Sequence, residues 1–208
     1  MYDISWLLFI GASLVVIVAP GQDMVLVMSR GIGQGARAGL ATAAGVCAGL
    51  LGHSVIATLG LGALLAASDM AYSALKYVGA AYLVYLGGRL LFAGKDGIGA
   101  RAIAKASIPR LFSEGALSNL SNPKIVLFYF AFLPQFVPAS ATHPSVLLFT
   151  LGVLFALLTF AVKVPVGLFA GALSNWFRAH PNALAWVFRS SGIMLIGLAL
   201  RLAFDERG

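Results

Sequence analysis

The sequence predicts an all-α integral membrane protein of six transmembrane helices, built as two inverted three-helix repeats with spans one and four interrupted. Composition, the length of the apolar runs and two matching helix breaks support this prediction. Apolar residues make up 60% of the 208 residues and charged residues only 10%, whereas soluble domains carry about 25% charged residues. We expect one transmembrane domain over residues 1–208, with repeat halves of about 1–100 and 101–208.

Six apolar runs can be drawn along the chain. Each is long enough to cross a bilayer as a helix, which takes about 20 apolar residues, and none shows the alternation of a membrane β-strand. The first run should remain as a span, because no basic residue precedes it and Pro20 follows the small residue at the only plausible signal-cleavage point. The runs cover residues 4–28, 38–67, 71–92, 115–137, 146–173 and 184–204.

The connections between the runs carry different charges on the two sides of the membrane. One side holds Arg30, Arg37, Lys95, Arg101, Lys105, Arg110 and Arg178. The other side holds Asp3, Asp69, Lys76, His143, Asp205, Glu206 and Arg207. An excess of Lys and Arg marks the cytoplasmic side, so both termini should lie outside. This asymmetry accounts for the net charge of +7. We therefore expect contact with anionic membrane lipid and no nucleic-acid partner.

The first run is interrupted at Pro20-Gly21. Pro20 cannot donate a backbone hydrogen bond, and its ring clashes with the carbonyl of Val16, while Gly21 lets the chain bend. Asp23 then places a carboxylate at membrane depth, which costs about 2.5–3.5 kcal/mol on insertion scales. A break and a charge at that depth are tolerated only where they face protein or a water-filled cavity.

The fourth run is interrupted about half a chain later. Asn122 is a good helix N-cap, and Pro123 is favoured at the first helical position, so a helix should restart at Pro123 after a short segment from about Phe112. The ends of spans three and six also share one spacing. Leu83, Leu86, Arg89, Leu90 and Phe92 correspond to Leu195, Leu198, Arg201, Leu202 and Phe204.

Three crossings in each half force the second half to insert upside down relative to the first. In transporters with such inverted repeats, interrupted helices in matching positions mark the substrate site. Here both breaks fall in the cytoplasmic half of the membrane and could face one another.

The broken helices predict a site for a small zwitterion. Helix starts offer N–H groups and a partial positive charge to a carboxylate, with Lys124 and Lys163 adding positive charge. Asp23, and the carbonyls that end the preceding half-helix, could hold an ammonium group, while Lys124 and the Asn122-Pro123 start would recognise the carboxylate. No cofactor or metal is expected. The predicted site comprises Pro20, Gly21, Gln22, Asp23, His53, Asn122, Pro123, Lys124 and Lys163.

Other interpretations of these residues stay open. Asp23 could be only a helix N-cap, and Lys124 could pair with Asp23 or reach lipid headgroups. Lys163 could lie near an interface. His53 could relay protons or be a buried structural histidine. Glycines spaced four apart, as at Gly35 and Gly39, predict close helix packing and a possible homodimer.

Three segments carry a resemblance to a known family. They are Ala19-Pro20-Gly21-Gln22-Asp23 followed by Gly31, Gly35, Gly39, Gly45 and Gly49, then Tyr77 to Leu83, and Ser121-Asn122-Pro123-Lys124 leading into Phe128 to Val137. The chain resembles the LysE/RhtB family of bacterial amino-acid exporters over nearly its whole length.

The resemblance implies a secondary-active transporter, not an enzyme, in the bacterial inner membrane. It implies export of an amino acid or close derivative, driven by the proton gradient. The family signature usually reads Pro-Gly-Pro followed by Asp or Asn, so Gln22 replaces the second proline here. An amide side chain could then add a hydrogen bond to the cargo or cap a helix end.

Other function classes fit the sequence less well. Thiol-based electron transfer needs a pair of membrane cysteines, and Cys47 is the single cysteine. Metal-ion export needs clustered histidines and carboxylates, but His53 stands alone in the spans. A structural subunit would not need paired breaks. Efflux of neutral compounds would be insensitive to Asp23→Asn.

Overall fold

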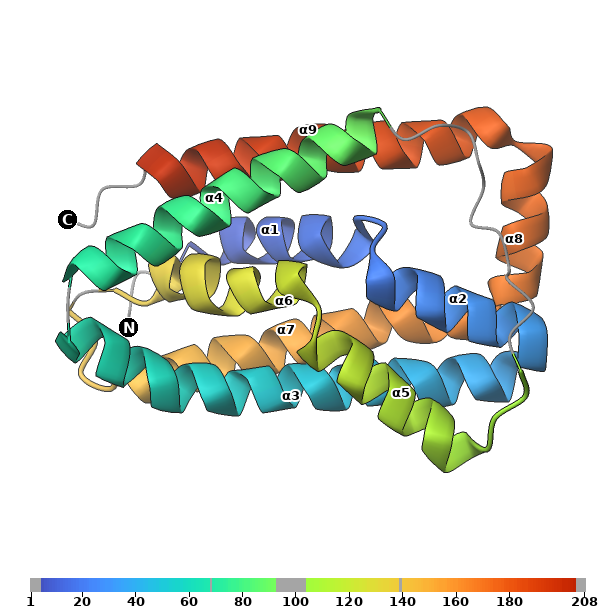
Figure 1. Cartoon of the computed structure of the whole chain (residues 1–208), viewed down its shortest axis with the longest axis horizontal. Helices are drawn as coiled ribbons and strands as arrows, with labels where there is room; N and C mark the ends of the chain where they lie inside the picture. The colour runs from blue at the N-terminus through green and yellow to red at the C-terminus, as the bar shows by residue number, and fades with distance from the viewer. Residues whose placement is uncertain (1–4, 68, 93–103, 139, 205–208) are drawn as a thin grey trace.

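The computed structural model describes residues 5–67, 69–92, 104–138 and 140–204, and these residues form helices and connecting turns (Figure 1). Asp3, Lys95, Arg101, Asp205, Glu206 and Arg207, on which the predicted orientation partly depends, lie outside the described residues. The elements are α1 (Trp6–Val18), α2 (Gln22–Gln34), α3 (Ala36–Ala67), α4 (Asp69–Leu91), α5 (Ile108–Leu120), α6 (Pro123–Leu127), a π-helical turn (Phe128–Phe132), a 3-10 turn (Leu133–Phe136), α7 (Pro144–Leu168), α8 (Ala170–Ala179) and α9 (Pro181–Phe204).

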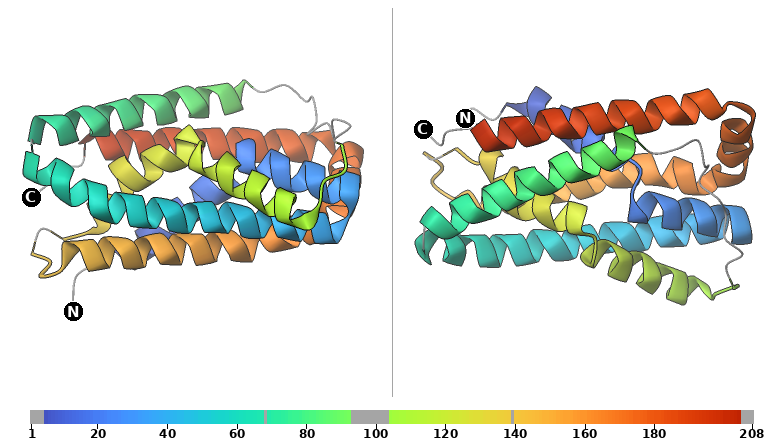
Figure 2. Two further views of the ribbon diagram at one scale, coloured as in Figure 1. Left: turned by 60° about the horizontal axis from the view of Figure 1, so that its bottom comes forward. Right: turned by 45° about the horizontal axis from the view of Figure 1, so that its top comes forward.

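Most helices run along one long axis, and α8 lies across one end of the bundle (Figures 1 and 2). Helix α3 packs against α5 and α7, and α4 packs against α9. The pairs α3 with α7 and α4 with α9 are antiparallel (Figure 1). Helix α1 begins and α9 ends at one end of the molecule, whereas the turn from α2 to α3 lies at the other.

The described helices differ in their capacity to span a membrane. Residues 36–60 of α3, all of α7 and all of α9 are each long and apolar enough. The pair α1 and α2 qualifies together as one span, bent by 54° at the break. The described residues therefore hold three or four candidate spans, against the six that the sequence predicts. Helix α4 contains Lys76 and Arg89, and the fourth predicted span is divided at Asn122.

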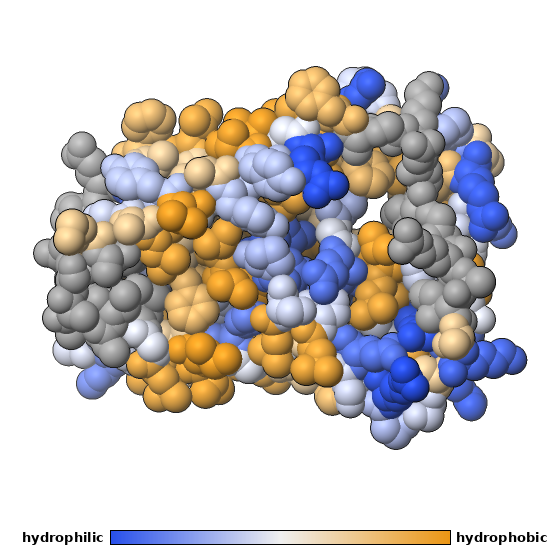
Figure 3. Space-filling view, viewed as in Figure 1, coloured by the Kyte–Doolittle hydropathy of each residue, from blue (hydrophilic) through white to orange (hydrophobic). Residues whose placement is uncertain are grey.

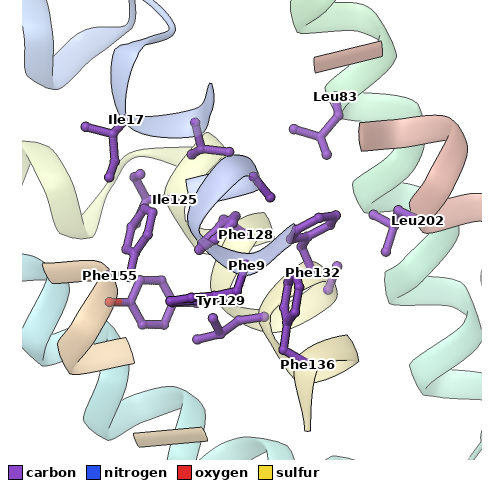
Figure 4. Packing of buried hydrophobic residues seen from close by; sticks show 14 of the residues in the cluster. Phe9, Ile17, Leu83, Ile125, Phe128, Tyr129, Phe132, Phe136, Phe155 and Leu202 are labelled. Atoms are coloured by element: carbon purple, nitrogen blue, oxygen red, sulfur yellow. The ribbon is translucent and has the colours of Figure 1, made fainter. Parts of the chain in front are cut away.

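An aromatic cluster fixes the segment that follows the second break. The rings of Phe128 and Phe155 stack with centroids 4.3 Å apart, and Phe9 meets Phe136 edge to face at 5.5 Å. Figure 4 shows these rings gathered where α1, α6 with its π-helical turn, and α7 meet. Because aromatic side chains bury large apolar areas, this cluster holds α6 against α1 and α7.

Glycines let the long helices approach closely inside the chain. A Cβ atom on Gly167 would lie 2.8 Å from the backbone of Gly39, and one on Gly192 would lie 2.6 Å from the carbonyl oxygen of Gly87. The packing role predicted for Gly39 is therefore confirmed, whereas a Cβ atom on Gly35 would meet nothing within 4 Å. The closely packed glycines contact other helices of the same chain, so their spacing no longer supports a homodimer. The homodimer stays a prediction.

The predicted fifth run, residues 146–173, is wrong at its end. Helix α7 ends at Leu168, and α8 begins at Ala170 in a new direction. Pro165 lies in the last turn of α7 and cannot donate to the carbonyl four residues earlier. Phe169 then leaves the helical conformation, with φ −104° and ψ 19°.

Candidate functional site

The two helix breaks are joined by a buried lysine. The ammonium of Lys124, at the start of α6, donates to the carbonyl oxygens of Val16 and Ala19 at the end of α1, each at 2.9 Å. The Val16 carbonyl lacks its helical donor, because in a continuous helix that donor would be the N–H of residue 20, and Pro20 has no N–H. Lys124 is buried, so it does not reach headgroups, and among the described residues it forms no ion pair with Asp23.

Gly21 provides the space for this lysine. It is the N-cap of α2 and has an extended conformation. A Cβ atom built at this position would lie only 3.2 Å from the Nζ atom of Lys124. Pro20 and Gly21 therefore act together, one freeing a carbonyl and the other leaving room for the ammonium that binds it.

The second break has the local structure that the sequence predicts. The Asn122 side chain accepts a hydrogen bond from the backbone N–H of Lys124 at 3.1 Å, and Pro123 is the first residue of α6. The predicted restart at Pro123 is confirmed. The segment before it, α5, begins at Ile108 instead of near Phe112.

Asp23 is buried and binds side chains of α5. Its carboxylate accepts a hydrogen bond from Nδ2 of Asn119 at 2.7 Å and a longer one from Oγ of Ser118 at 3.4 Å. The N-cap of α2 is Gly21, so Asp23 does not serve as the helix cap. Gln22 is exposed, and its amide donates to the Ser118 carbonyl at 3.3 Å.

His53 supports this arrangement from α3. Its Nε2 lies 3.2 Å from the carbonyl oxygen of Asn119, and a carbonyl only accepts, so Nε2 carries the hydrogen. The ring stacks on Tyr129 with centroids 5.4 Å apart, and its Nδ1 has no partner among the described residues. These contacts match a buried structural histidine; a proton relay through His53 stays a prediction.

A small cavity lies where the breaks meet. About 10 Å³ of it is open to the centre of a water-sized sphere, room for roughly one water molecule. Asp23, Lys124 and Lys163 bring charge to its wall. Its apolar lining includes Ile17, Ile125 and Phe155, which are labelled in Figure 4. The full lining is Val16, Ile17, Asp23, Leu50, Asn119, Lys124, Ile125, Phe155, Thr159 and Lys163.

The structure thus separates the predicted site residues into two groups. Asp23, Lys124 and Lys163 line the cavity. Pro20, Gly21, Gln22, His53, Asn122 and Pro123 are not among the lining residues, and most of them shape the breaks around it. Lys163 is buried in α7 and makes no hydrogen bond or ion pair within the described part of the chain.

Polar contacts continue along α2 and α5, away from the cavity. Arg30 lies about two turns beyond Asp23 on α2 and pairs with Glu114 of α5 at 2.5 Å. It also donates to the carbonyl of Ala104 at 2.8 Å. We call the interface that holds these contacts and those of Asp23 the α2–α5 seam.

Sequence reasoning missed the partners in this seam. The sequence marks Arg30 only as an orientation signal, and it gives no specific role to Ser118 or Asn119. The one feature of the sequence that could have indicated these three residues is that they are polar and lie inside or beside an apolar run. Within the described ranges, no three His, Cys, Asp or Glu side chains lie close enough together to hold a metal ion.

The family model described as "LysE type translocator" matches residues 14–206. The chain belongs to the LysE-type translocator family. The predicted resemblance is confirmed, and with its long apolar helices this LysE-type translocator is a membrane protein.

Curated relatives of this LysE-type translocator cover nearly all of it. The leucine efflux protein of Salmonella typhimurium is 30% identical over 201 residues, 95% of this chain and 93% of its own. The uncharacterized membrane protein YrhP of Bacillus subtilis is 32% identical, over 95% of this chain and 97% of its own. A membrane protein of Vibrio cholerae is 31% identical, over 95% and 96%. No solved structure matches the chain significantly.

Proposed function

We propose that this chain is a secondary-active exporter of a small amino acid or close derivative in the bacterial inner membrane. The observation that carries the proposal is the meeting of two helix breaks around a buried cavity that holds both signs of charge. Family membership and the relative named a leucine efflux protein support the cargo class.

The lining favours a zwitterion with an apolar side chain. Asp23 would bind the ammonium of the cargo, and a buried lysine would bind its carboxylate. Ile17, Ile125 and Phe155 would contact the side chain, so leucine is a suitable probe. Because the cavity has room for roughly one water, it must open to admit an amino acid. The structure therefore corresponds to a closed state of the transport cycle.

Asp23 also suits proton antiport, because a carboxylate can bind either the ammonium of the cargo or a proton. An ammonium beside a carboxylate favours its ionised form, so the cargo and a proton would compete for Asp23. Cargo leaving on the outer side would be replaced by a proton, which is released again when new cargo binds inside. A lysine that binds the carboxylate would stay protonated with cargo bound, so it cannot supply this exchange.

We also propose the six-span inverted repeat for this single transporter domain, with halves of about 1–100 and 101–208. The equivalent elements of the halves would be α1–α2 and α5–α6, α3 and α7, and α4 and α9. Members of each pair run in opposite directions in Figures 1 and 2, as inversion requires.

The proposed orientation places both termini outside. The exposed side chains of Arg37, Arg110 and Arg178 belong to the end of the bundle where α2 meets α3. Figure 3 shows strongly hydrophilic side chains gathered toward that end and many apolar side chains over the rest of the visible face. An excess of positive charge marks the cytoplasmic side, and the apolar surface would contact lipid.

Efflux from living cells tests the proposed function. Cells are preloaded with a mixture of dipeptides that they hydrolyse, and release of each amino acid is compared for the intact protein, Asp23→Asn and an empty vector. At equal membrane abundance we expect faster release of apolar amino acids with the intact protein only. Asp23→Asn should lower that rate more than about tenfold, because removing one partner of a buried charge pair costs about 2–5 kcal/mol.

Two outcomes would contradict the proposal in different ways. Equal efflux by Asp23→Asn would leave transport in place and remove Asp23 from the mechanism, as expected for efflux of neutral compounds. No release of any amino acid above the empty vector would refute the cargo class and favour export of another metabolite or a non-transporting role.

A further inference from the structure

We infer that the two buried lysines have different roles: Lys163 binds the carboxylate of the cargo, and Lys124 is a positioning residue that closes the first helix break. The sequence alone favours Lys124 and the Asn122-Pro123 helix start as the site for the carboxylate. The inference rests on the proposed function and assigns one subsite within the same cavity.

Lys124 is already committed to protein groups. Its ammonium donates to two carbonyl oxygens of α1, Val16 and Ala19. The Val16 carbonyl has lost its usual helical donor at Pro20, and at membrane depth an unpaired backbone carbonyl is strongly unfavourable. If Lys124 turned to a substrate carboxylate, it would leave both carbonyls without this donor. Lys124 thus occupies the carbonyl oxygens at the C-terminal end of α1, which could otherwise have held the ammonium of the cargo.

Lys163 has the opposite situation. It is 4% exposed, it lines the cavity, and it has no hydrogen-bond or ion-pair partner in the part of the chain that the structure describes. Buried cations in proteins are normally paired. The carboxylate of Asp23 lines the same cavity but forms no ion pair with Lys163 in the described structure, and it accepts hydrogen bonds from Asn119 and Ser118. A substrate carboxylate would give Lys163 the direct ion-pair partner that it lacks among the described residues.

The position of Lys163 suits this role geometrically. It projects from α7, a continuous helix, whereas Asp23 projects from α2 beyond the first break, and both line the same cavity. Thr159, one turn earlier on α7, donates its hydroxyl hydrogen to the Phe155 carbonyl at 2.8 Å. That hydrogen is therefore not available to bind the carboxylate of the cargo, and Lys163 is. A zwitterion between α2 and α7 would then meet Asp23 with its ammonium and Lys163 with its carboxylate.

Equilibrium binding of two probes to the purified full-length protein tests the inference. Leucine carries both charged groups, and leucinamide keeps the ammonium and side chain but lacks the carboxylate. Titration calorimetry in detergent gives the two dissociation constants for the intact protein, Lys163→Met, Lys163→Arg and Lys124→Met, and thermal unfolding shows that each variant is folded. Lys163→Gln replaces Lys163→Met if that variant does not fold.

The intact protein should prefer leucine over leucinamide by at least about tenfold, or 1.4 kcal/mol. Lys163→Met should bring the ratio of the two dissociation constants close to one, by weakening leucine and strengthening the cationic leucinamide. Lys163→Arg keeps the charge and should keep a clear preference. Lys124→Met should unfold at a lower temperature, while its folded fraction retains the intact ratio.

The inference is overturned if folded Lys163→Met keeps the intact preference, or if folded Lys124→Met loses it. Failure of the proposed function is distinguishable, because the intact protein would then bind neither leucine nor any other amino acid. That result would overturn the subsite assignment together with the cargo class.

Discussion

At the scale of residues, the first break depends on a missing hydrogen atom. Pro20 cannot donate to the Val16 carbonyl, and Lys124 from the other half of the chain donates to it instead, at 2.9 Å. Gly21 leaves the space in which that ammonium sits. The residues of the Pro-Gly signature therefore act through a contact with a distant lysine, and not only by bending the helix.

Gly21→Ala tests this contact. Its new Cβ would lie 3.2 Å from the Lys124 Nζ, so the lysine must move, and overpacking of this kind costs about 1–3 kcal/mol. We expect a lower thermal unfolding temperature in detergent and slower leucine efflux. Gly33→Ala is the matched control on the same helix, because nothing lies within 4 Å of its Cβ position. Equal unfolding temperatures for the two variants would contradict the account.

Gln22→Pro should be tolerated, although it changes a residue beside the break. Gln22 is exposed, begins α2, and makes one long side-chain contact, 3.3 Å to the Ser118 carbonyl. Proline suits the first position of a helix, and the extended Gly21 before it suits a following proline. We expect leucine efflux within about threefold of the intact rate, since a lost exposed hydrogen bond is worth only about 1 kcal/mol. A loss as severe as that of Asp23→Asn would place the Gln22 amide in the site.

At the scale of elements, the α2–α5 seam is a line of polar contacts between two half-helices. Its inner end is the contact of Asp23 with Asn119, and its outer end is the pair of Arg30 with Glu114. The half-helices at the two breaks are thus held together along much of their length. The cavity lies beside the inner end of this seam.

The outer end of the seam should contribute to stability. The side chain of Arg30 is 8% exposed, and Glu114→Gln would remove the negative charge that faces it. We expect a loss of about 1.5–3 kcal/mol, the usual worth of a hydrogen bond to a charged group, seen as a lower thermal unfolding temperature. Arg110→Gln is the control: Arg110 also pairs with Glu114 but is 73% exposed, and surface pairs contribute about 0–1 kcal/mol. The account fails if the control destabilises the protein as much.

At the scale of the whole molecule, local chemistry could be predicted from the sequence, and distant contacts could not. The break at Pro20 and the restart at Pro123 follow from backbone rules that apply wherever the chain lies. The bonds of Lys124 to α1 and of Asp23 to Asn119 join residues about a hundred positions apart, and only packing brings them together. The turn into α8 cannot be located from the sequence, because residues 169–173 continue the apolar run and Pro165 indicates only that the helix could be disturbed near its end.

The predicted orientation can be tested on the whole protein with single cysteines. In a Cys47→Ala background, Arg37→Cys and His143→Cys place exposed thiols at opposite ends of the bundle. A membrane-impermeant maleimide should label His143→Cys in intact cells and Arg37→Cys only after the cells are opened, because the basic end should face the cytoplasm. The reverse pattern would invert the proposed topology.

Competition between cargo and proton for Asp23 can be measured as the release of protons when leucine binds. Leucine is added to purified protein in weakly buffered detergent solution at a series of pH values from neutral to acid, and released protons are counted beside the heat of binding. Competition predicts that the intact protein releases protons on binding leucine wherever the free protein carries a protonated Asp23, because an ammonium favours the ionised carboxylate, and that Asp23→Asn releases far fewer. Leucine binding with no proton release, or with equal release by Asp23→Asn, would contradict it.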